Sequence, residues 1–348
     1  MKKNIQAIVV VVVVLIIILV SVFTNKQVTG QFTIGVILPL SGGAAIWGEN
    51  VKNGMDLALI NHPDIKVIYQ DSKGTPADGV SAFQLLRDQK TNITVSVLSA
   101  VSVTLSKLAL EEKSPLFVTL TAADNIANDY TVRYYNDSSN FAGPAFSDPT
   151  SPLSKVQKIA VLYRNDDLGK SVLKQIQNLA VDNKKEIVFS DSFSPNEINF
   201  STLLLKIKST KAEALMFVPV TPSEAVGIVK TANQLKIGIP LIEASNVFAD
   251  LSNRAQVAGL TFYSNIYDFS LPENGLEFKK LYREKYGKEP NFGAAYGYDT
   301  INTLSQCKTK TDVLTCLRDM KQIDGIIGHA KQIKPGDFNV PLNFNKVN

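Results

Sequence analysis

Residues 34–48 read IGVILPLSGGAAIWG and join an apolar run, a double glycine and the start of a helical pattern. The apolar run has no polar alternation, which is typical of a parallel strand covered by helices on both faces. Gly42 and Gly43 permit the tight turn that must follow the strand. Trp47 then opens a stretch with helical spacing of its apolar residues. The segment therefore predicts the first strand–turn–helix unit of an open α/β sheet.

The same alternation recurs on both sides of one polar interruption. Before it, strands are expected at residues 32–38, 66–69, 93–98 and 116–120, with helices at 47–61, 77–88 and 105–112. Residues 121–152 contain several Asn, Pro and Gly and suit a linker. After them, strands are expected at residues 159–163, 186–190, 214–218, 240–242 and 260–263, with helices at 167–181, 200–208 and 223–235. The fold class predicted is α/β, with two doubly wound, Rossmann-like lobes.

The last third of the chain is expected to pass between these lobes. Helical patterns at residues 276–286, 292–304 and 313–320 have no sheet of their own, so they should return to the first lobe. We expect residues 31–140 plus 270–327 in the first lobe and residues 141–269 plus 328–348 in the second. Several chain crossings would then form a hinge on which the lobes can close.

The first 30 residues have the pattern of a signal or anchor segment. Lys2 and Lys3 precede residues 7–23, which are apolar except for Ser21 and long enough for a hydrophobic helix that enters a membrane. The lysines should stay in the cytoplasm, which places the body outside it, in the periplasm or at the cell surface. The sequence leaves open whether this segment stays as a transmembrane anchor or is cleaved.

The body carries almost no net charge. Of 36 Lys and Arg residues, three precede residue 31, where no acid lies, so 33 cations accompany 32 Asp and Glu residues in the remainder. No cationic cluster could neutralise phosphates, so no nucleic-acid partner is expected. Two histidines and two cysteines without zinc-site spacing predict no metal. No GxSxG nucleophile elbow is present, which argues against an enzyme, and no cofactor motif is found.

The two cysteines are expected to pair. Cys307 and Cys316 lie nine positions apart across a polar stretch between two helical patterns. Disulfides persist outside the cytoplasm, so this arrangement predicts a staple between the two helices. The alternative is two free buried thiols.

The chain resembles the type 1 periplasmic binding proteins, in particular the branched-chain amino-acid (Leu/Ile/Val) binding proteins of ABC transporters. Besides residues 34–48, the resemblance rests on residues 53–58 (NGMDLA), 115–119 (PLFVT), 158–163 (KIAVLY), 298–299 (YD) and 336–337 (GD). It implies a monomeric, non-enzymatic protein that closes around a small polar ligand, such as an amino acid or amide, and delivers it to an ABC permease. Two alternatives are a ligand-sensing receptor domain that acts through a membrane partner and an α/β hydrolase.

The resemblance also implies a set of first-lobe ligand contacts. Ligands of open α/β sheets sit beyond the carboxyl ends of the strands. Trp47 would line the cleft there, unless it packs only on its own sheet. Hydroxyl groups after the third and fourth strands hold amino-acid ligands in relatives; the matching positions here are Ser99, Ala100 or Ser102, and Thr121 or Ala123. An alanine at the usual threonine position would remove one hydroxyl from this polar clamp.

In the second lobe the resemblance implies an acid that pairs with a ligand ammonium group. Glu243, Ser245 and Asn246 compete for that position, and Glu243 is preferred unless it is only a turn residue. In relatives, the loop before the first helix of the second lobe usually supplies an aromatic ligand contact. Here that position falls near Leu168, and no aromatic residue stands there. The remaining expected ligand contacts are Thr221 and Tyr296 or Tyr298.

Overall fold

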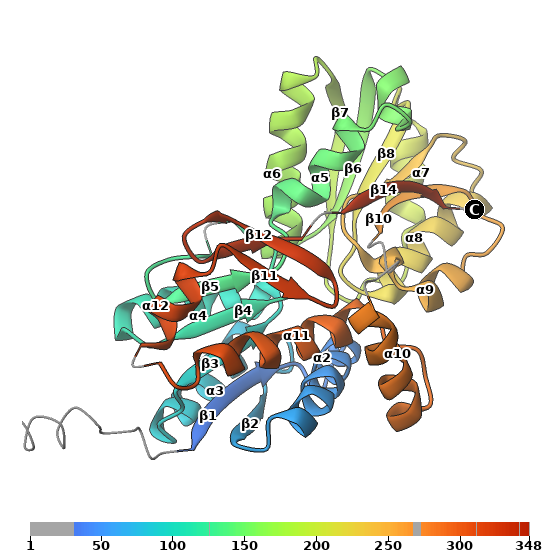
Figure 1. Cartoon of the computed structure of the whole chain (residues 1–348). Coiled ribbons are helices and arrows are strands. Elements are labelled where there is room, and N and C mark those ends of the chain that lie inside the picture. Colours follow the sequence, from blue (N-terminus) through green and yellow to red (C-terminus); the bar gives the residue numbers. More distant parts are fainter. Residues whose placement is uncertain (1–30, 125, 267–272, 311, 341, 348) are drawn as a thin grey trace, which may run out of the picture.

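The computed structural model describes residues 31–124, 126–266, 273–310, 312–340 and 342–347. Two α/β lobes lie one above the other, each built on its own sheet (Figure 1). The expected amino-terminal hydrophobic helix lies outside these residues. Within them, no helix combines the length and the apolar character needed to cross a bilayer.

The first lobe contains a sheet with the strand order β2-β1-β3-β4-β5-β13-β12-β11. Its strands are β1 (Phe32–Leu38), β2 (Ile65–Asp71), β3 (Ile93–Val97), β4 (Leu116–Thr119), β5 (Thr131–Tyr134), β11 (Gln322–Gly325), β12 (Gly328–Lys334) and β13 (Asp337–Asn339). The helices of this lobe are α2 (Ala45–Ala58), α3 (Pro76–Asp88), α4 (Ser99–Glu112), α10 (Glu273–Tyr286), α11 (Phe292–Cys307) and α12 (Val313–Asp319). All pairings from β2 to β13 are parallel.

Alternate side chains of β1 enter hydrophobic clusters on opposite faces of the sheet. Val36 and Leu38 join the large cluster that includes α2 and α11, whereas Ile37 joins a second cluster with α3 and α4. Helices therefore cover both faces of the sheet, as the uninterrupted apolar run predicted.

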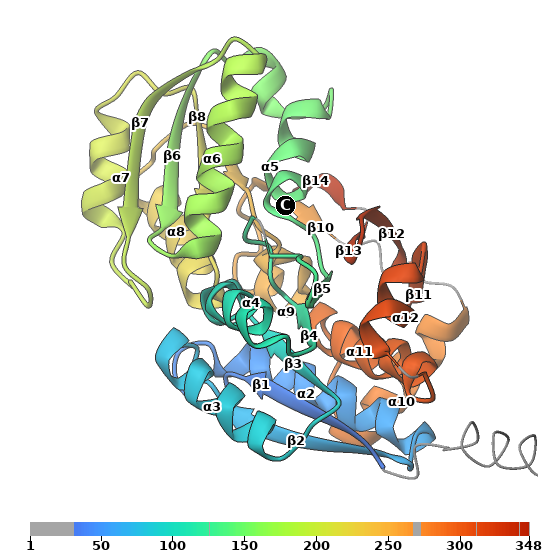
Figure 2. The same cartoon turned by 90° about the vertical axis from the view of Figure 1, so that its left-hand side faces the viewer.

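The second lobe contains a sheet with the order β14-β10-β9-β8-β6-β7. Its strands are β6 (Lys158–Arg164), β7 (Glu186–Phe193), β8 (Ala214–Val218), β9 (Leu241–Glu243), β10 (Phe262–Ile266) and β14 (Asn343–Val347). The α-helices are α5 (Ser138–Ser147), α6 (Asp167–Asp182), α7 (Ser201–Lys208), α8 (Pro222–Gln234) and α9 (Leu251–Ala255), with 3-10 turns at Pro152–Lys155 and Val247–Ala249. Figure 2 shows α6 and α4 on the same side of the molecule, one from each lobe.

The chain passes between the sheets three times: after β5, between β10 and α10, and between β13 and β14. The last crossing differs from the sequence expectation, which gave residues 328–348 to the second lobe. β12 and β13 instead belong to the first sheet, and only β14 joins the second. The reason is that β13 pairs in parallel with β5, a strand of the first sheet far away in the sequence, which places Asp337 against Arg133.

Two glycines let α2 and α11 pack backbone to backbone. A Cβ atom on Gly54 would lie 1.8 Å from the carbonyl oxygen of Ala294, and one on Gly297 would lie 2.1 Å from the carbonyl oxygen of Val51. Such distances are shorter than any real contact, so only glycine fits at either position. The close crossing fixes α2 and α11 relative to each other near the cleft between the lobes.

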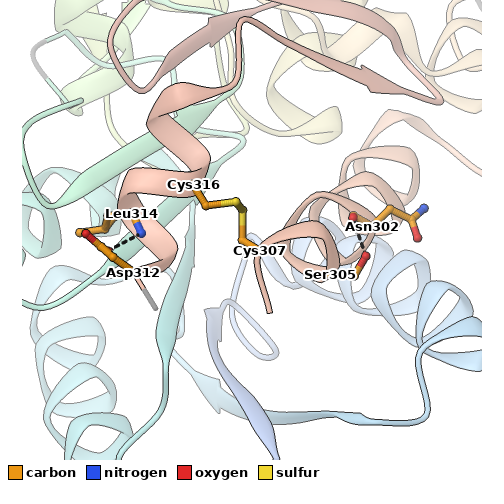
Figure 3. Close-up of a disulfide and its surroundings, with 6 residues drawn as sticks. All are labelled: Asn302, Ser305, Cys307, Asp312, Leu314 and Cys316. Carbon is orange, nitrogen blue, oxygen red and sulfur yellow. Dashed lines mark hydrogen bonds between the residues drawn. A yellow bond between two sulfur atoms is a disulfide. The ribbon is translucent and has the colours of Figure 1, made fainter. Parts of the chain in front are cut away.

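The predicted disulfide is confirmed. Cys307 at the end of α11 bonds to Cys316 within α12, with 5.8 Å between their Cα atoms (Figure 3). Asp312 caps α12 by accepting a hydrogen bond from the Leu314 amide. In the chain-entropy account, closing so short a loop stabilises the fold by roughly 2–3 kcal/mol.

A buried carboxyl joins α11 to the sheet. Asp299 accepts hydrogen bonds from the hydroxyl of Tyr134 at 3.0 Å and from the amide of Ile326 at 2.8 Å. Burial raises the pKa of Asp299 from 3.8 to about 7, although these hydrogen bonds oppose the shift. The side chain thus ties β5 and the β11–β12 turn to α11.

The pH dependence of stability tests this burial. Because the folded pKa of Asp299 lies above its ordinary value, its contribution to stability is complete below about pH 4 and is lost as the pH rises through about 7. We expect Asp299→Asn, which does not titrate, to lose less stability than the parent chain between about pH 5 and pH 8. Thermal unfolding of both proteins across this range measures the difference. Equal losses would contradict the raised pKa.

Candidate functional site

A cavity lies where the lobes meet. Both sheets contribute residues that follow the carboxyl ends of their strands, where open α/β sheets bind ligands. The first lobe and the first crossing supply Trp47, Leu98, Leu120, Ala122, Tyr135 and Phe292. The second lobe supplies Phe141, Leu168, Pro219, Val220, Ser245, Asn246 and Val247. The walls are mainly apolar, and none of these side chains is charged.

Trp47 occupies a central place in this cavity. Its ring centroid lies 5.1 Å from that of Phe292. Its indole nitrogen donates a hydrogen bond of 3.0 Å to the carbonyl oxygen of Val220 in the second lobe. The side chain is only 3% exposed, so the indole both lines the cavity and links the lobes.

The lobes also touch on the side of α4 and α6. The amide of Asp124 donates to the Ser171 hydroxyl at 3.2 Å, and the Gln175 amide group donates to the Asp124 carboxylate at 3.3 Å. Together with the Trp47–Val220 bond, these contacts hold the lobes against each other around the cavity. The arrangement is therefore a closed one.

Two residues on the first-lobe side of the cavity have an unusual, left-handed backbone conformation. Leu98 and Leu120 have φ angles of 74° and 48°, in the left-handed region that non-glycine residues rarely adopt. Such strain costs about 1–3 kcal/mol per residue and is concentrated at binding sites. Leu98 precedes α4, whose first turn receives no side-chain cap and includes Ala100. Backbone N–H groups at the positive end of α4 thus lie beside the cavity.

The predicted hydroxyl residues differ in their hydrogen-bond partners. The Ser99 oxygen accepts hydrogen bonds from the amides of Ala122 and Ala123 at 3.0 and 3.2 Å, next to the cavity wall. No described residue accepts the hydrogen of this hydroxyl. Ser102 and Thr121 lie deeper, fully buried and 3.0 Å apart, and bond to each other. All three hydroxyl residues therefore lie outside the cavity lining, and Ser99 is bonded to one of its residues, Ala122.

Glu243 does not point into the cavity. One carboxylate oxygen accepts bonds from the Ser245 hydroxyl and the Val247 amide, the latter at 2.7 Å. The other accepts bonds from the Ser264 hydroxyl and from the Phe248 amide at 3.3 Å. Burial raises the pKa of Glu243, and these four hydrogen bonds oppose the shift. Its carboxylate thus supports the 245–248 turn, whose residues Ser245, Asn246 and Val247 line the cavity, in place of the expected contact with the ligand.

The other predicted contacts lie outside the cavity lining. Thr221 forms a reciprocal capping box with Glu224 at the start of α8. Tyr296 packs against Tyr135, with 4.9 Å between ring centroids, and so supports a residue of the cavity wall. Tyr298 packs against Phe278 of α10. Among the residues expected from the sequence, the cavity is lined by Trp47, Leu168 and Ser245, together with Asn246.

Sequence reasoning missed most of the apolar wall. Leu98 and Leu120 are the last residues of expected strands and Pro219 follows another, so their positions could have been found from strand order alone. The residues predicted from the sequence are mostly the polar ones beside them. Phe292 has no local signal, because it reaches the cavity only through the close crossing of α2 and α11.

The fold and the cleft define a two-lobed solute-binding protein. The sequence model of the periplasmic binding proteins matches residues 31–341, and the chain belongs to that family. The family consists of solute-binding proteins, not enzymes, and acts outside the cytoplasm. The resemblance seen in the sequence is thereby confirmed.

Two curated relatives are named for branched-chain amino acids. The chain is 31% identical over 202 residues to Leu/Ile/Val-binding protein homolog 3 of Brucella melitensis, an alignment that covers 53%, about half, of each protein. It is 25% identical over 336 residues to Leu/Ile/Val-binding protein BraC3 of Rhizobium johnstonii, covering 88% of each.

Solved structures share the fold. The branched-chain amino-acid binding protein LivJ of Streptococcus pneumoniae, in complex with isoleucine, has a TM-score of 0.75 at 22% identity, with 89% of this chain and 94% of that chain covered. A solute-binding protein of Rhodopseudomonas palustris in complex with 3,4-dihydroxybenzoic acid has a TM-score of 0.77 at 21% identity, with 90% and 92% covered. At these identities the likeness shows the fold alone.

Proposed function

We propose that the protein is the solute-binding component of an ABC transporter and that it closes over one small solute in the cavity beside Trp47. The observation that carries the proposal is a cavity lined by both lobes at the carboxyl ends of their strands. The solute-binding proteins of Streptococcus pneumoniae and Rhodopseudomonas palustris, with isoleucine and 3,4-dihydroxybenzoic acid, support this assignment. A monomer tethered through residues 7–23, or released by cleavage, would present the closed form to a permease.

The cavity favours a solute with one apolar body and one polar end. Phe141, Leu168 and Val247 offer apolar surface, whereas Ser245 and Asn246 offer polar side chains. Closure buries the solute between these two sides. Binding energy then favours the closed state to the extent that contacts exist only when both lobes are engaged.

Trp47 provides the experiment, because it is the only tryptophan of the chain. A solute that enters the cavity should change the emission of Trp47 and raise the melting temperature with the same saturation curve. Trp47→Phe, which removes the hydrogen bond to Val220, should weaken binding about fivefold by calorimetry, since one such bond contributes about 1 kcal/mol. Failure of amino acids, aromatic acids and amides alike to bind the folded protein would refute the proposed function.

A further inference from the structure

We infer that Asp250 and Asn291 form a bridge that stabilises the closed arrangement of the two lobes, although neither residue lines the cavity. Asp250 belongs to the second lobe and Asn291 to the first. The Asn291 amide group donates a hydrogen bond of 3.3 Å to the Asp250 carboxylate. The inference rests on the proposed function and specifies a contact that favours closure, whichever solute is bound.

Both residues are held in place because each caps a helix. One oxygen of Asp250 accepts hydrogen bonds from the amide and the hydroxyl of Ser252, both at 2.9 Å, at the start of α9. The side-chain oxygen of Asn291 accepts a 3.0 Å bond from the Ala294 amide at the start of α11. The second oxygen of Asp250 and the amide group of Asn291 then point to each other. Side chains fixed in this way lose little entropy when the lobes meet.

The bridge lies directly behind both walls of the cavity. In the first lobe it is followed by Phe292, which packs on Trp47, and in the second lobe it comes three residues after Val247. Figure 1 shows α9 and α10 on the right of the molecule and α4 and α6 on the left, where Asp124 joins the lobes. The lobes are therefore bonded to each other on two sides of the cavity.

Electrostatics also favours this contact. The Asp250 carboxylate lies beside the start of α11, where unpaired N–H groups give the helix a partial positive charge. Asp250 interacts in addition with Arg254 of its own helix, an interaction that does not depend on the other lobe. The charged first-lobe residues of the groove around the bridge are Lys279, Lys288 and Glu289, an excess of one positive charge. A contact that exists only in the closed form shifts the equilibrium toward that form.

Asn291→Asp tests the bridge on the full chain. Aspartate caps a helix as well as asparagine does, but the variant places two carboxylates against each other when the lobes close. Trp47 is the only tryptophan and is 3% exposed, so acrylamide quenching of its emission reports opening even without a solute. We expect quenching at least about twofold stronger than in the parent chain. Whichever of the probes isoleucine and 3,4-dihydroxybenzoate binds the parent should bind the variant at least about fivefold more weakly by calorimetry.

Two further variants separate the bridge from a general effect of charge. In Asp250→Asn/Asn291→Asp the donor and the acceptor exchange places, and each residue keeps an oxygen for its helix cap. Quenching and affinity should return to within about twofold of the parent values. Gln256→Glu makes the same change of amide to carboxylate on an exposed residue of the same groove and should leave quenching close to that of the parent.

The outcomes decide the bridge and the proposed function separately. Parent-like quenching in a folded Asn291→Asp variant would overturn the inference, as would equal effects of Asn291→Asp and Gln256→Glu. If Asn291→Asp does not fold, the charge-exchanged variant decides: parent-like quenching supports the bridge and strong quenching refutes it. If amino acids, aromatic acids and amides all fail to bind the folded parent, the proposed function fails, whereas the quenching comparison still decides whether the bridge holds the lobes together.

Discussion

Replacing Arg133 with methionine should lower the free energy of unfolding by about 3–5 kcal/mol. The Arg133 guanidinium bonds to both oxygens of Asp337 at 2.6 and 2.8 Å and to the carbonyl oxygen of Ala123 at 2.9 Å. The two charged side chains are 2% and 0% exposed. Without the guanidinium, the buried Asp337 carboxylate keeps, among the described residues, only the ion pair with Lys334 at 3.3 Å, and the Lys334 side chain is half exposed. Urea unfolding followed by circular dichroism measures the loss.

A surface pair provides the matched control. Arg87 also pairs with an acid, Glu112, but its side chain is 48% exposed. Arg87→Met should therefore cost less than about 1 kcal/mol. The double variant Arg133→Met/Asp337→Leu should recover much of the stability, because no isolated charge remains. Similar losses for Arg133→Met and Arg87→Met would refute this account of the buried pair.

Introducing a methyl group at Gly54 should cost about 3 kcal/mol, at the upper end of what overpacking usually costs. The added carbon would meet a backbone oxygen of α11 at 1.8 Å, and a helix backbone cannot rotate away as a side chain can. The two helices must separate, which also moves Trp47 away from Phe292. Gly54→Ala should therefore lose both thermal stability and solute affinity, measured by calorimetry.

Gly143→Ala in α5 is the control for Gly54→Ala. A Cβ atom there would meet nothing within 4 Å, so the change in stability should stay within about 1 kcal/mol. If Gly54→Ala is tolerated as well as Gly143→Ala, the close helix crossing is not needed for the fold.

Local sequence pattern predicted the strands well but not all of the helix limits. The expected first strand at residues 32–38 matches β1 at Phe32–Leu38. The helix expected from residue 105 begins at Ser99, six positions earlier. Residues 99–104 are serine, threonine, valine and alanine, most of which favour helices only weakly. This turn becomes helical because the fold places it at the cleft, where tertiary contacts override propensity.

Local sequence patterns could not predict which strands pair when they lie far apart in the sequence. The strand-like character of residues 323–348 is visible in the sequence, but nothing local specifies that β13 pairs with β5. The same limit applies to Glu243, whose position at the end of β9 was predicted from the resemblance. Its engagement by Ser264, 21 residues away, depends on β10 lying beside β9. Sequence therefore located the cleft, and the fold decided which side chains face it.

The three connections between the sheets turn closure into an intramolecular step. A solute resting on one lobe meets the other at an effective concentration on the order of millimolar or higher, set by short tethers. A modest affinity of the solute for each lobe can thereby give tight binding by the two lobes together. Release of the cargo then requires only that the two faces be pulled apart.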